Sequence, residues 1–248
     1  MAGSQNAVME YERATPDGTL AYSYRHAHPA VTVDCVVFGL DGGRLKVLLV
    51  QRDLDPFAGH WALPGGFVRI DEDLETAARR ELEEETGVSR LYIEQLGAFG
   101  DPQRDPRERI ITVAWWAVVN LYKQRTAAAS DARNVGWFAV DDLPPLAFDH
   151  NRILDAALAR LRETLRREPL AFEFLPGKFS LTQLQRFYEI VLGRPLDKRN
   201  FRKKVLSYGV LCELDEYEAD VAHRAAKLYA FDKHRYGAFR ADGGRFVV

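Results

Sequence analysis

Three glutamates with helical spacing are the most chemically informative residues of this chain. Glu81, Glu84 and Glu85 stand at positions i, i+3 and i+4 of the segment 74–86, which is rich in Ala, Leu, Glu and Arg and is followed by Gly87. This composition predicts a helix with a glycine C-cap, so the three carboxylates project from one face. Like charges at this spacing repel each other, and no lysine separates them. A lone acidic triplet would suit an ordinary exposed helix, but it also suits Mg²⁺ or Mn²⁺, which prefer carboxylate oxygens and can hold a pyrophosphate.

The residues around the triplet favour the metal site. The segment GFVRIDEDLETAARRELEEETGV resembles the Nudix signature, which reads G, five residues, E, seven residues, R-E-apolar-x-E-E-x-G-apolar. Every place of the pattern is filled, by Gly66, Glu72, Arg80, Glu81, Leu82, Glu84, Glu85, Gly87 and Val88. The resemblance implies an α/β/α sandwich with a mixed sheet. It also implies that Glu81, Glu84 and Glu85 bind the metal, that Arg80 orients the carboxylates through a salt bridge, and that the catalytic residues are Arg80, Glu84 and Glu85.

Residues outside the signature suit a ligand that carries phosphate and ribose. The glycines at 65 and 66 let bare backbone approach a phosphate. The loop 101–109 (DPQRDPRER) offers three guanidinium forks, although a solvated surface loop is the alternative. Pro102 follows Gly87 by fifteen residues, a placement similar to that in Nudix ADP-ribose pyrophosphatases. We expect ligand binding by Arg52, Gly65, Gly66, Arg104, Arg107 and Arg109, and packing or capping roles for His60, Trp61 and His150.

Strand patterns surround this site. Residues 31–40 and 45–51 alternate around a DGG turn and predict a hairpin, and the apolar run 111–119 predicts a strand buried on both faces. Further strands are expected at 92–99 and 135–138. Asp149 is expected to cap a helix that runs to about residue 167. The predicted domains are an N-terminal arm (1–29), a Nudix effector domain (30–148), a linking helix (149–168) and a C-terminal winged helix-turn-helix domain (169–248).

The pattern of the last third predicts that DNA-binding domain. Ser180 and Gln183 form a capping box that opens a helix at 181–192, and Asp197 caps a second helix at 198–207 after a Gly-Arg-Pro turn. Apolar stretches at 210–214 and 227–231 then suggest a hairpin. Helix, turn, helix and hairpin form the outline of a winged helix-turn-helix.

The second of these helices begins with KRNFRKK, five cations without an acid. A helix that enters the major groove reads bases from its N-terminal residues, so Asn200 could pair with adenine and Arg202 with guanine. Phe201 and Val205 are expected to face the core. The remaining cations are expected at phosphates. The predicted DNA-binding residues are Gln183, Lys198, Arg199, Asn200, Arg202, Lys203 and Lys204.

Bulk composition is compatible with two domains that have different partners. Residues 1–165 carry a net charge of −7 and residues 166–248 a net charge of +5. The two cysteines, Cys35 and Cys212, are not in a CxxC pair, which favours free thiols in a reducing cytoplasm and no zinc site. No apolar run is long enough to span a bilayer, and the N-terminus lacks the apolar core of a signal peptide, so no membrane association is expected.

Taken along residues 30–231, the chain resembles the NrtR family of bacterial transcriptional regulators of NAD metabolism. The resemblance rests on the Nudix signature followed by DPQRDPRERI, LPPLAFDH and LQRFYEIVLGRPLDKRNFRKKV. It implies a Nudix domain that senses ADP-ribose and a winged helix that binds operator DNA as a dimer. We therefore expect a homodimeric repressor of NAD-cofactor genes on a palindromic operator, with ADP-ribose or a related nucleoside diphosphate as effector. We expect it to be cytoplasmic, and nucleoid-associated when bound to DNA.

The intact signature leaves alternatives open. One is a Mg²⁺-dependent Nudix hydrolase that splits ADP-ribose into AMP and ribose 5-phosphate, alone or alongside DNA binding. The other is a related regulator that answers to a sugar or sugar phosphate. The basic segment 198–204 favours a regulator, because a plain hydrolase has no use for it, whereas the intact glutamate triplet favours hydrolysis.

Overall fold

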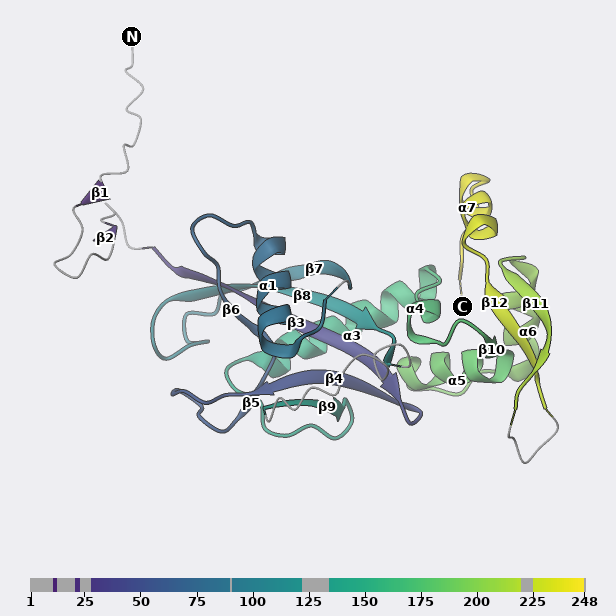
Figure 1. Ribbon diagram of the computed structural model, residues 1–248, viewed down its shortest axis with the longest axis horizontal. Helices are drawn as coiled ribbons and strands as arrows, with labels where there is room; N and C mark the ends of the chain where they lie inside the picture. Colours follow the sequence, from purple (N-terminus) through teal and green to yellow (C-terminus); the bar gives the residue numbers. More distant parts are fainter. Residues whose placement is uncertain are drawn as a thin grey trace, which may run out of the picture.

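The computed structural model describes residues 11–12, 21–22, 28–89, 91–121, 134–219 and 225–247. Most of the predicted arm lies outside these residues, apart from an antiparallel pair of β1 (Tyr11–Glu12) and β2 (Ala21–Tyr22). Figure 1 shows a larger half built on a sheet and a smaller half at the C-terminal end, joined by the helix α3.

A seven-stranded mixed sheet forms the larger half. β3 and β8 are parallel and lie at its centre, and the other pairs are antiparallel, which confirms the predicted mixed sheet and the β3–β4 hairpin. β8 is buried along nearly its whole length, as predicted for a strand covered on both faces. The strands are β3 (Ala30–Asp41), β4 (Arg44–Gln51), β5 (Trp61–Ala62), β6 (Gly65–Phe67), β7 (Tyr92–Phe99), β8 (Ile110–Val119) and β9 (Val135–Ala139).

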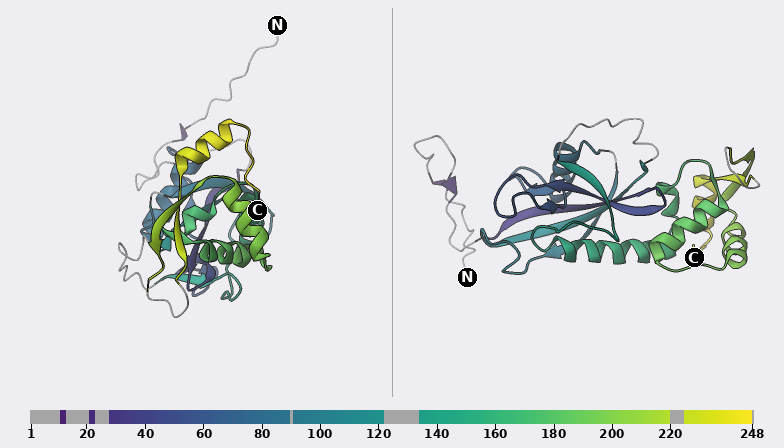
Figure 2. Two further views of the ribbon diagram at one scale, coloured as in Figure 1. Left: turned by 90° about the vertical axis from the view of Figure 1, so that its right-hand side faces the viewer. Right: turned by 90° about the horizontal axis from the view of Figure 1, so that it is seen from below.

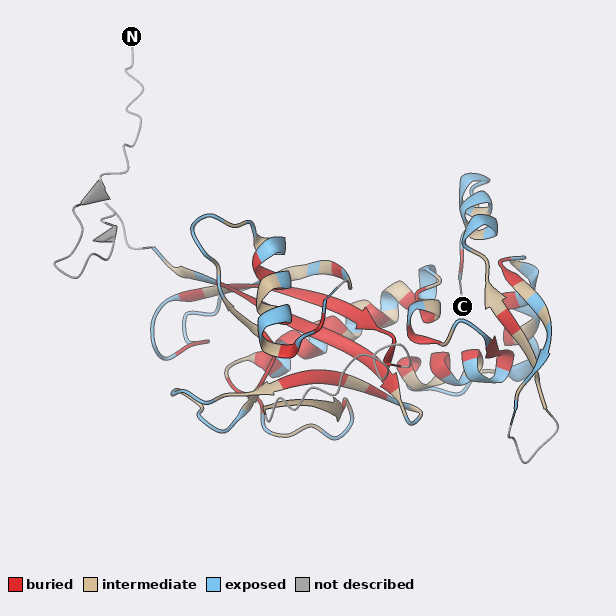
Figure 3. Ribbon diagram, in the orientation of Figure 1, coloured by how far each residue is buried: buried red, intermediate tan, exposed pale blue. Residues whose placement is uncertain are grey.

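Helices cover both faces of this sheet. Successive side chains of β3 point to opposite faces, so Cys35 packs with the buried side of α1 (Leu74–Thr86) and Val36 packs with that of α3 (His150–Arg167). Figure 2 shows the sheet between the two helices, and Figure 3 shows that the central strands and the inner side of α3 are buried. The predicted α/β/α sandwich is therefore confirmed.

The two helices begin differently. Asp73 caps α1, its carboxylate accepting from the backbone N–H of Thr76 at 2.7 Å, and Gly87 ends the helix in the left-handed conformation. Asp149 precedes α3, but its side chain makes no capping hydrogen bond. Asp149 is therefore the N-cap residue by position, as predicted, but the expected side-chain cap is absent, because its carboxylate accepts instead from Arg104, at 2.7 Å.

The C-terminal half is a winged helix, as predicted. The capping box is present, with the N–H of Gln183 donating to Ser180 Oγ (3.2 Å) and the N–H of Ser180 donating to Gln183 Oε1 (2.8 Å). Asp197 accepts from the N–H of Asn200 at 2.8 Å and caps the next helix. The elements are α4 (Ala171–Phe174), β10 (Phe179–Ser180), α5 (Leu181–Leu192), α6 (Lys198–Ser207), β11 (Leu211–Tyr217), β12 (Lys227–Phe231) and α7 (Lys233–Ala241), of which α4, β10 and α7 were not predicted.

One hydrophobic cluster continues from the sheet into the winged helix. Ile153, Leu154, Leu161 and Leu165 of α3 all belong to it. The same buried cluster contains Phe38 and Val47 of the sheet and Phe174 and Leu184 of the winged helix. The linking helix is thus part of the core of both halves. No helix in the described part of the chain is long and apolar enough to cross a membrane.

Candidate functional site

The sheet splits along one edge of β3, and a cleft opens at the split. Residues 38–41 of β3 pair with β4, whereas residues 32–34 pair with β6 on the same edge, because β8 occupies the other edge. β4 and β6 therefore diverge. The cleft between them has a volume of about 610 Å³, within the range of small-molecule sites. Its lining includes Thr32, Asp34, Arg52, Gly65, Gly66, Phe67, Glu85, Arg104, Arg107, Phe148 and His150.

Glu85 brings the glutamate helix into this cleft. Its Oε2 accepts from the backbone N–H of Gly65 at 2.9 Å. Burial raises the pKa of Glu85 to about 7, and the nearby carboxylates of Glu81 and Asp34 add to the rise. A carboxyl group with a pKa near neutrality can take up or release a proton at working pH, which suits acid–base chemistry.

Arg80 holds the other carboxylates of the signature. Its Nη1 donates to Glu81 Oε1 at 2.6 Å and to Glu84 Oε2 at 3.2 Å, and its Nε donates to Glu72 Oε2 at 2.9 Å. The hydrogen bond from Arg80 lowers the pKa of Glu72 to about 2. The salt bridge predicted for Arg80 is thus present, and it orients two of the three carboxylates of the acidic face.

The donor set of this face fits a divalent metal ion, although its side chains are not gathered around one point. No group of three acidic, histidine or cysteine side chains within the described residues is arranged to hold a metal ion. The reason is that Arg80 holds Glu81 and Glu84, whereas Glu85 turns to Gly65. A Cβ on Gly66 would lie 2.5 Å from Glu81 Cδ, so the bare glycine makes room for that carboxylate. Three carboxylates beside such a space match the oxygen ligands that Mg²⁺ and Mn²⁺ prefer.

The glycine pair serves the packing of the site. A Cβ on Gly65 would lie 2.1 Å from the carbonyl oxygen of Val33, so only glycine lets β6 lie against β3 at this point. Sequence reasoning assigned both glycines to phosphate approach alone. The structure adds a second reason for them: Gly65 lets β6 pack closely on β3, and Gly66 lets β6 pack closely on Glu81 of α1.

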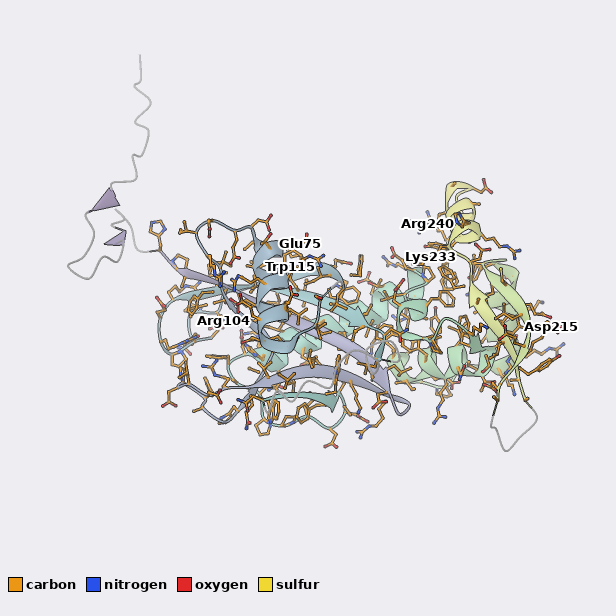
Figure 4. The ribbon with its side chains drawn as sticks, viewed as in Figure 1. Glu75, Arg104, Trp115, Asp215, Lys233 and Arg240 are labelled. Atoms are coloured by element: carbon orange, nitrogen blue, oxygen red, sulfur yellow. The ribbon has the colours of Figure 1, made fainter. Side chains whose placement is uncertain are left out.

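The four predicted arginines have different environments. Arg52 and Arg107 line the cleft, and Arg107 is also bonded to Asp105 at 2.7 Å. Arg104 lines the cleft but is only 4% exposed, with its guanidinium held by Asp149 at 2.7 Å and Asp34 at 3.3 Å. Figure 4 shows Arg104 on the side of the sheet half that lies away from the winged helix.

Arg109 and Arg104 differ from the expectation that they are free to bind a ligand in the cleft. Arg109 does not line the cleft, because its guanidinium lies near the backbone carbonyls of Asp101 and Ile110. Arg104 is paired with two carboxylates, so its charge is already compensated. The loop is also not a solvated surface segment throughout, since Arg104 and Asp105 are both buried.

The histidines and the tryptophan match their expected supporting roles. His150 is buried, and its Nδ1 accepts from the backbone N–H of Leu63 at 2.9 Å. Burial lowers the pKa of His150, which favours the neutral form of the ring. Trp61 packs its ring on Phe138 with a centroid distance of 4.5 Å, and His60 is exposed at the edge of Phe57.

The basic helix α6 presents most of its predicted contacts to solvent. Phe201 and Val205 are buried as predicted. Arg202 differs, since its Nη2 donates to Thr182 Oγ1 of α5 at 2.8 Å and the residue is only half-exposed. Gln183 uses its side-chain oxygen in the capping box, although the residue is exposed. The exposed positions are Lys198, Arg199, Asn200, Lys203 and Lys204.

Comparison with known proteins matches both halves. The NUDIX domain model covers residues 28–158, and the model of the NrtR DNA-binding winged helix domain covers residues 171–231. The chain is 38% identical over 212 residues to a protein of Acinetobacter baylyi called the ADPR responsive transcriptional repressor NtrR, covering 84% of each chain. The chain belongs to the NrtR family.

Some relatives match the whole chain, and others match only its Nudix half. Shewanella oneidensis NrtR, in a crystal structure with a 27mer DNA, superposes with a TM-score of 0.73 at 34% identity, covering 87% of this chain and 97% of that one. The ADP-ribose pyrophosphatase of Methanocaldococcus jannaschii is 39% identical over 129 residues, 52% of this chain and 73% of that enzyme. An enzyme therefore matches only the Nudix half, whereas the regulators match both halves.

Several residues of the NrtR cleft were missed by sequence reasoning. Thr32, Asp34, Phe67 and Phe148 all line it. Phe67 directly follows Gly66, and Phe148 directly precedes Asp149. The position of Phe67 next to Gly66 was the one available signal, because a cleft produced by two diverging strands has no pattern of its own in the sequence.

Proposed function

We propose that this member of the NrtR family is a ligand-responsive transcriptional repressor of NAD-cofactor metabolism genes, with ADP-ribose as effector. The observation that carries the proposal is the union of three parts in one chain. These are a cleft whose lining includes three arginines, an exposed basic helix α6, and the helix α3, whose buried side chains belong to one cluster with those of the sheet and of the winged helix. The named repressor of A. baylyi responds to the same ligand.

The cleft is suited to a diphosphate that carries sugars. Arg52 and Arg107 offer guanidinium groups beside Gly65 and Gly66, which form its backbone wall. Arg104 also lines the cleft, but in the free protein its guanidinium is paired with Asp34 and Asp149, so a ligand binds it in competition with these carboxylates. Arg109 does not line the cleft and is the weakest of the predicted ligand contacts. We assign Mg²⁺ or Mn²⁺ to Glu81, Glu84 and Glu85, where it would bind phosphate oxygens.

Communication between the cleft and the DNA is assigned to Arg104 and α3. Arg104 lines the cleft and binds Asp149, the residue directly before α3. An anionic ligand competes with Asp149 for this guanidinium, and release of Asp149 alters the start of the helix. Because the far end of α3 is packed in the core of the winged helix, its displacement changes how α6 meets the major groove.

DNA binding is assigned to a homodimer on a palindromic operator. A two-fold dimer presents two copies of α6, and half-sites then lie about one or two helical turns apart. Asn200 is placed to read a base, with Lys198, Arg199, Lys203 and Lys204 at phosphates, and Gln183 at the backbone. Such a repressor acts in the cytoplasm and is nucleoid-associated when bound to DNA.

Hydrolysis of ADP-ribose is a second candidate activity. It is favoured by the complete carboxylate set of the signature, of which Glu85 lines the cleft. Water would cleave the pyrophosphate linkage and release AMP and ribose 5-phosphate, removing the effector. Arg80, Glu84 and Glu85 are the residues assigned to this step.

A gel shift tests the regulatory proposal. The full chain is incubated with DNA from upstream of its own gene, first alone, then with ADP-ribose and separately with ribose 5-phosphate. The expected result is a retarded band that ADP-ribose releases and ribose 5-phosphate does not. A band that persists at saturating ADP-ribose would leave this ligand as a substrate or a bystander, and the hydrolase would become the leading function.

A further inference from the structure

A buried carboxylate of β3 stands in the cleft beside one of its arginines. Asp34 lines the cleft and is only 6% exposed. Its Oδ2 accepts from Arg104 Nη2 at 3.3 Å, and its Oδ1 lies 3.6 Å from His150 Nε2. Because His150 Nδ1 accepts from a backbone N–H, the neutral ring carries its proton on Nε2, the nitrogen that faces Asp34. Both oxygens of Asp34 therefore face donors of the protein itself.

Arg104 is shared between two carboxylates. Asp149 Oδ1 accepts from its guanidinium at 2.7 Å, and Asp34 Oδ2 accepts from it at 3.3 Å. One cation and two anions leave this group with a net negative charge, and all three side chains are almost completely buried. Water screens such charges weakly, so the group repels an anionic ligand as long as Arg104 stays with both partners.

The fold restrains the two carboxylates to different degrees. Asp34 lies inside the sheet, where its backbone pairs with Gly65 of β6 on one side and with Ala114 of β8 on the other. A Cβ on Gly65 would lie 2.9 Å from Asp34 Oδ1, so the carboxylate is packed closely against β6. Asp149 instead directly precedes α3 and follows Phe148, whose φ of 54° is in the left-handed region that bulky residues avoid. Asp34 is thus the more firmly held of the two.

We propose that Asp34 sets the affinity of the cleft for anionic ligands, as a fixed carboxylate that competes with a phosphate group for Arg104. Asp149 competes for the same guanidinium, but its release is the one that reaches α3. Asp34 then limits how tightly the ligand binds, and Asp149 signals that it has bound. The inference rests on the proposed function for the ligand, ADP-ribose, and for the route through Asp149. It predicts that removing the charge of Asp34 strengthens binding, an outcome that a damaged fold does not produce.

Calorimetry on the full chain tests this role. All proteins carry Glu85→Gln, so that ADP-ribose is not hydrolysed, and Asp34→Asn is compared with this parent. One unit charge near a phosphate in an almost buried site changes affinity by about tenfold or more, so Asp34→Asn should bind ADP-ribose more tightly by at least that factor. The gain should persist when the salt concentration is raised, because buried charges are screened weakly.

Two further variants serve as checks. Asp34→Ser offers an uncharged hydroxyl that can accept from Arg104 without placing an amide N–H against His150, so it should show the same direction of change. Asp53→Asn is the matched control, because Asp53 also lines the cleft but is exposed to solvent. Removal of this exposed charge should change ADP-ribose affinity by less than about threefold.

The coupling ratio separates Asp34 from Asp149. This ratio is the ADP-ribose affinity of the free protein divided by that of the operator complex. Asp34→Asn should keep the ratio of the parent, whereas Asp149→Asn should lower it toward one. Unchanged or weaker ADP-ribose binding in both Asp34 variants, or loss of folding in both, overturns the role of Asp34. A ratio that falls in Asp34→Asn as it does in Asp149→Asn overturns the division between the two carboxylates.

This inference and the proposed function fail separately. If Asp34→Asn binds ADP-ribose more tightly while ADP-ribose leaves the operator complex of the parent intact, Asp34 limits the affinity and ADP-ribose is not the effector. If ADP-ribose releases the operator from the parent and from Asp34→Asn at the same concentration, the repressor stands and the role of Asp34 is wrong.

Discussion

Glu84 and Glu85 are two of the three carboxylates that we propose as metal ligands. Replacing both with glutamine keeps their size and removes two of the three carboxylates, so binding of Mn²⁺ measured by calorimetry should be lost. DNA binding without effector should survive, because the change relieves repulsion on the helix face and leaves the fold intact. Glu83→Gln is the control, since Glu83 is exposed on the same helix. Unchanged Mn²⁺ binding in the double variant would show that the metal site is misassigned.

His150 makes the stability of the sheet half sensitive to acid. Burial lowers its pKa in the folded protein, whereas the unfolded chain takes up the proton near the ordinary value of 6.5. The unfolded state therefore binds more protons below that pH, and the free energy of unfolding falls by up to about 1.4 kcal/mol per pH unit until the folded histidine also titrates. Urea unfolding at about pH 7, 6 and 5 measures this slope.

His150→Asn is the matched variant for this prediction. The asparagine oxygen can still accept from the N–H of Leu63, but it does not titrate. The variant should show a shallower fall in the free energy of unfolding with acidification. Equal slopes in the two proteins would show that His150 does not carry the acid sensitivity.

Residue types were easier to predict than residue partners. The glutamates proposed as metal ligands and their partner Arg80 could be named because the signature lies within one helix and the turn before it. Arg104 was named as a ligand contact, yet its carboxylate partners Asp34 and Asp149 come from β3 and from the start of α3. Pairings across such distances along the chain follow from the tertiary packing and have no local pattern.

At the scale of elements, local rules predicted the helices that carry the chemistry. The Asp197 cap, the capping box at Ser180 and the glycine after α1 act within one or two turns, so sequence alone located these ends. α4 and β10 were missed because each is very short. The cleft was missed because it results from the divergence of β4 and β6, which depends on how strands pair across the sheet.

Substitutions in α6 should distinguish residues that contact bases from residues that contact phosphates. Asn200 and Lys203 are both exposed on it. Lys203→Ala should weaken binding to every DNA sequence alike and reduce the slope of log affinity against log salt by about one unit, because one phosphate contact is lost. Asn200→Ala should instead cost about 1–3 kcal/mol on the operator and relax preference at one base pair.

Gel shifts across several salt concentrations, with operator and unrelated DNA, measure both effects. Arg202 was predicted to read guanine, but its bond to Thr182 ties it to α5 in the free protein. Micromolar binding without any sequence preference at physiological salt would contradict the assignment of α6 as a recognition helix.

For the whole molecule, ligand and DNA must influence each other equally. Coupling between two sites is a free energy shared by both, so if ADP-ribose weakens operator binding, the operator must weaken ADP-ribose binding by the same factor. Typical coupling corresponds to roughly five- to 150-fold. The measurement is a titration of ADP-ribose into the free protein and into the protein–operator complex, with Glu85→Gln as background so that the ligand is not hydrolysed. Equal affinities in the two titrations would remove ADP-ribose as effector.

The bond between Arg104 and Asp149 should carry this coupling. Asp149→Asn keeps the size of the side chain but removes the charge that competes with the ligand for Arg104, so ADP-ribose no longer displaces an ion pair at the start of α3. The ratio of ADP-ribose affinities, free against operator-bound, should fall toward one in this variant, while operator binding without ligand stays near the wild-type value. Asp155→Asn, at an exposed position of the same helix, should keep the wild-type ratio. If Asp149→Asn keeps it as well, the signal reaches the winged helix by a route other than the start of α3.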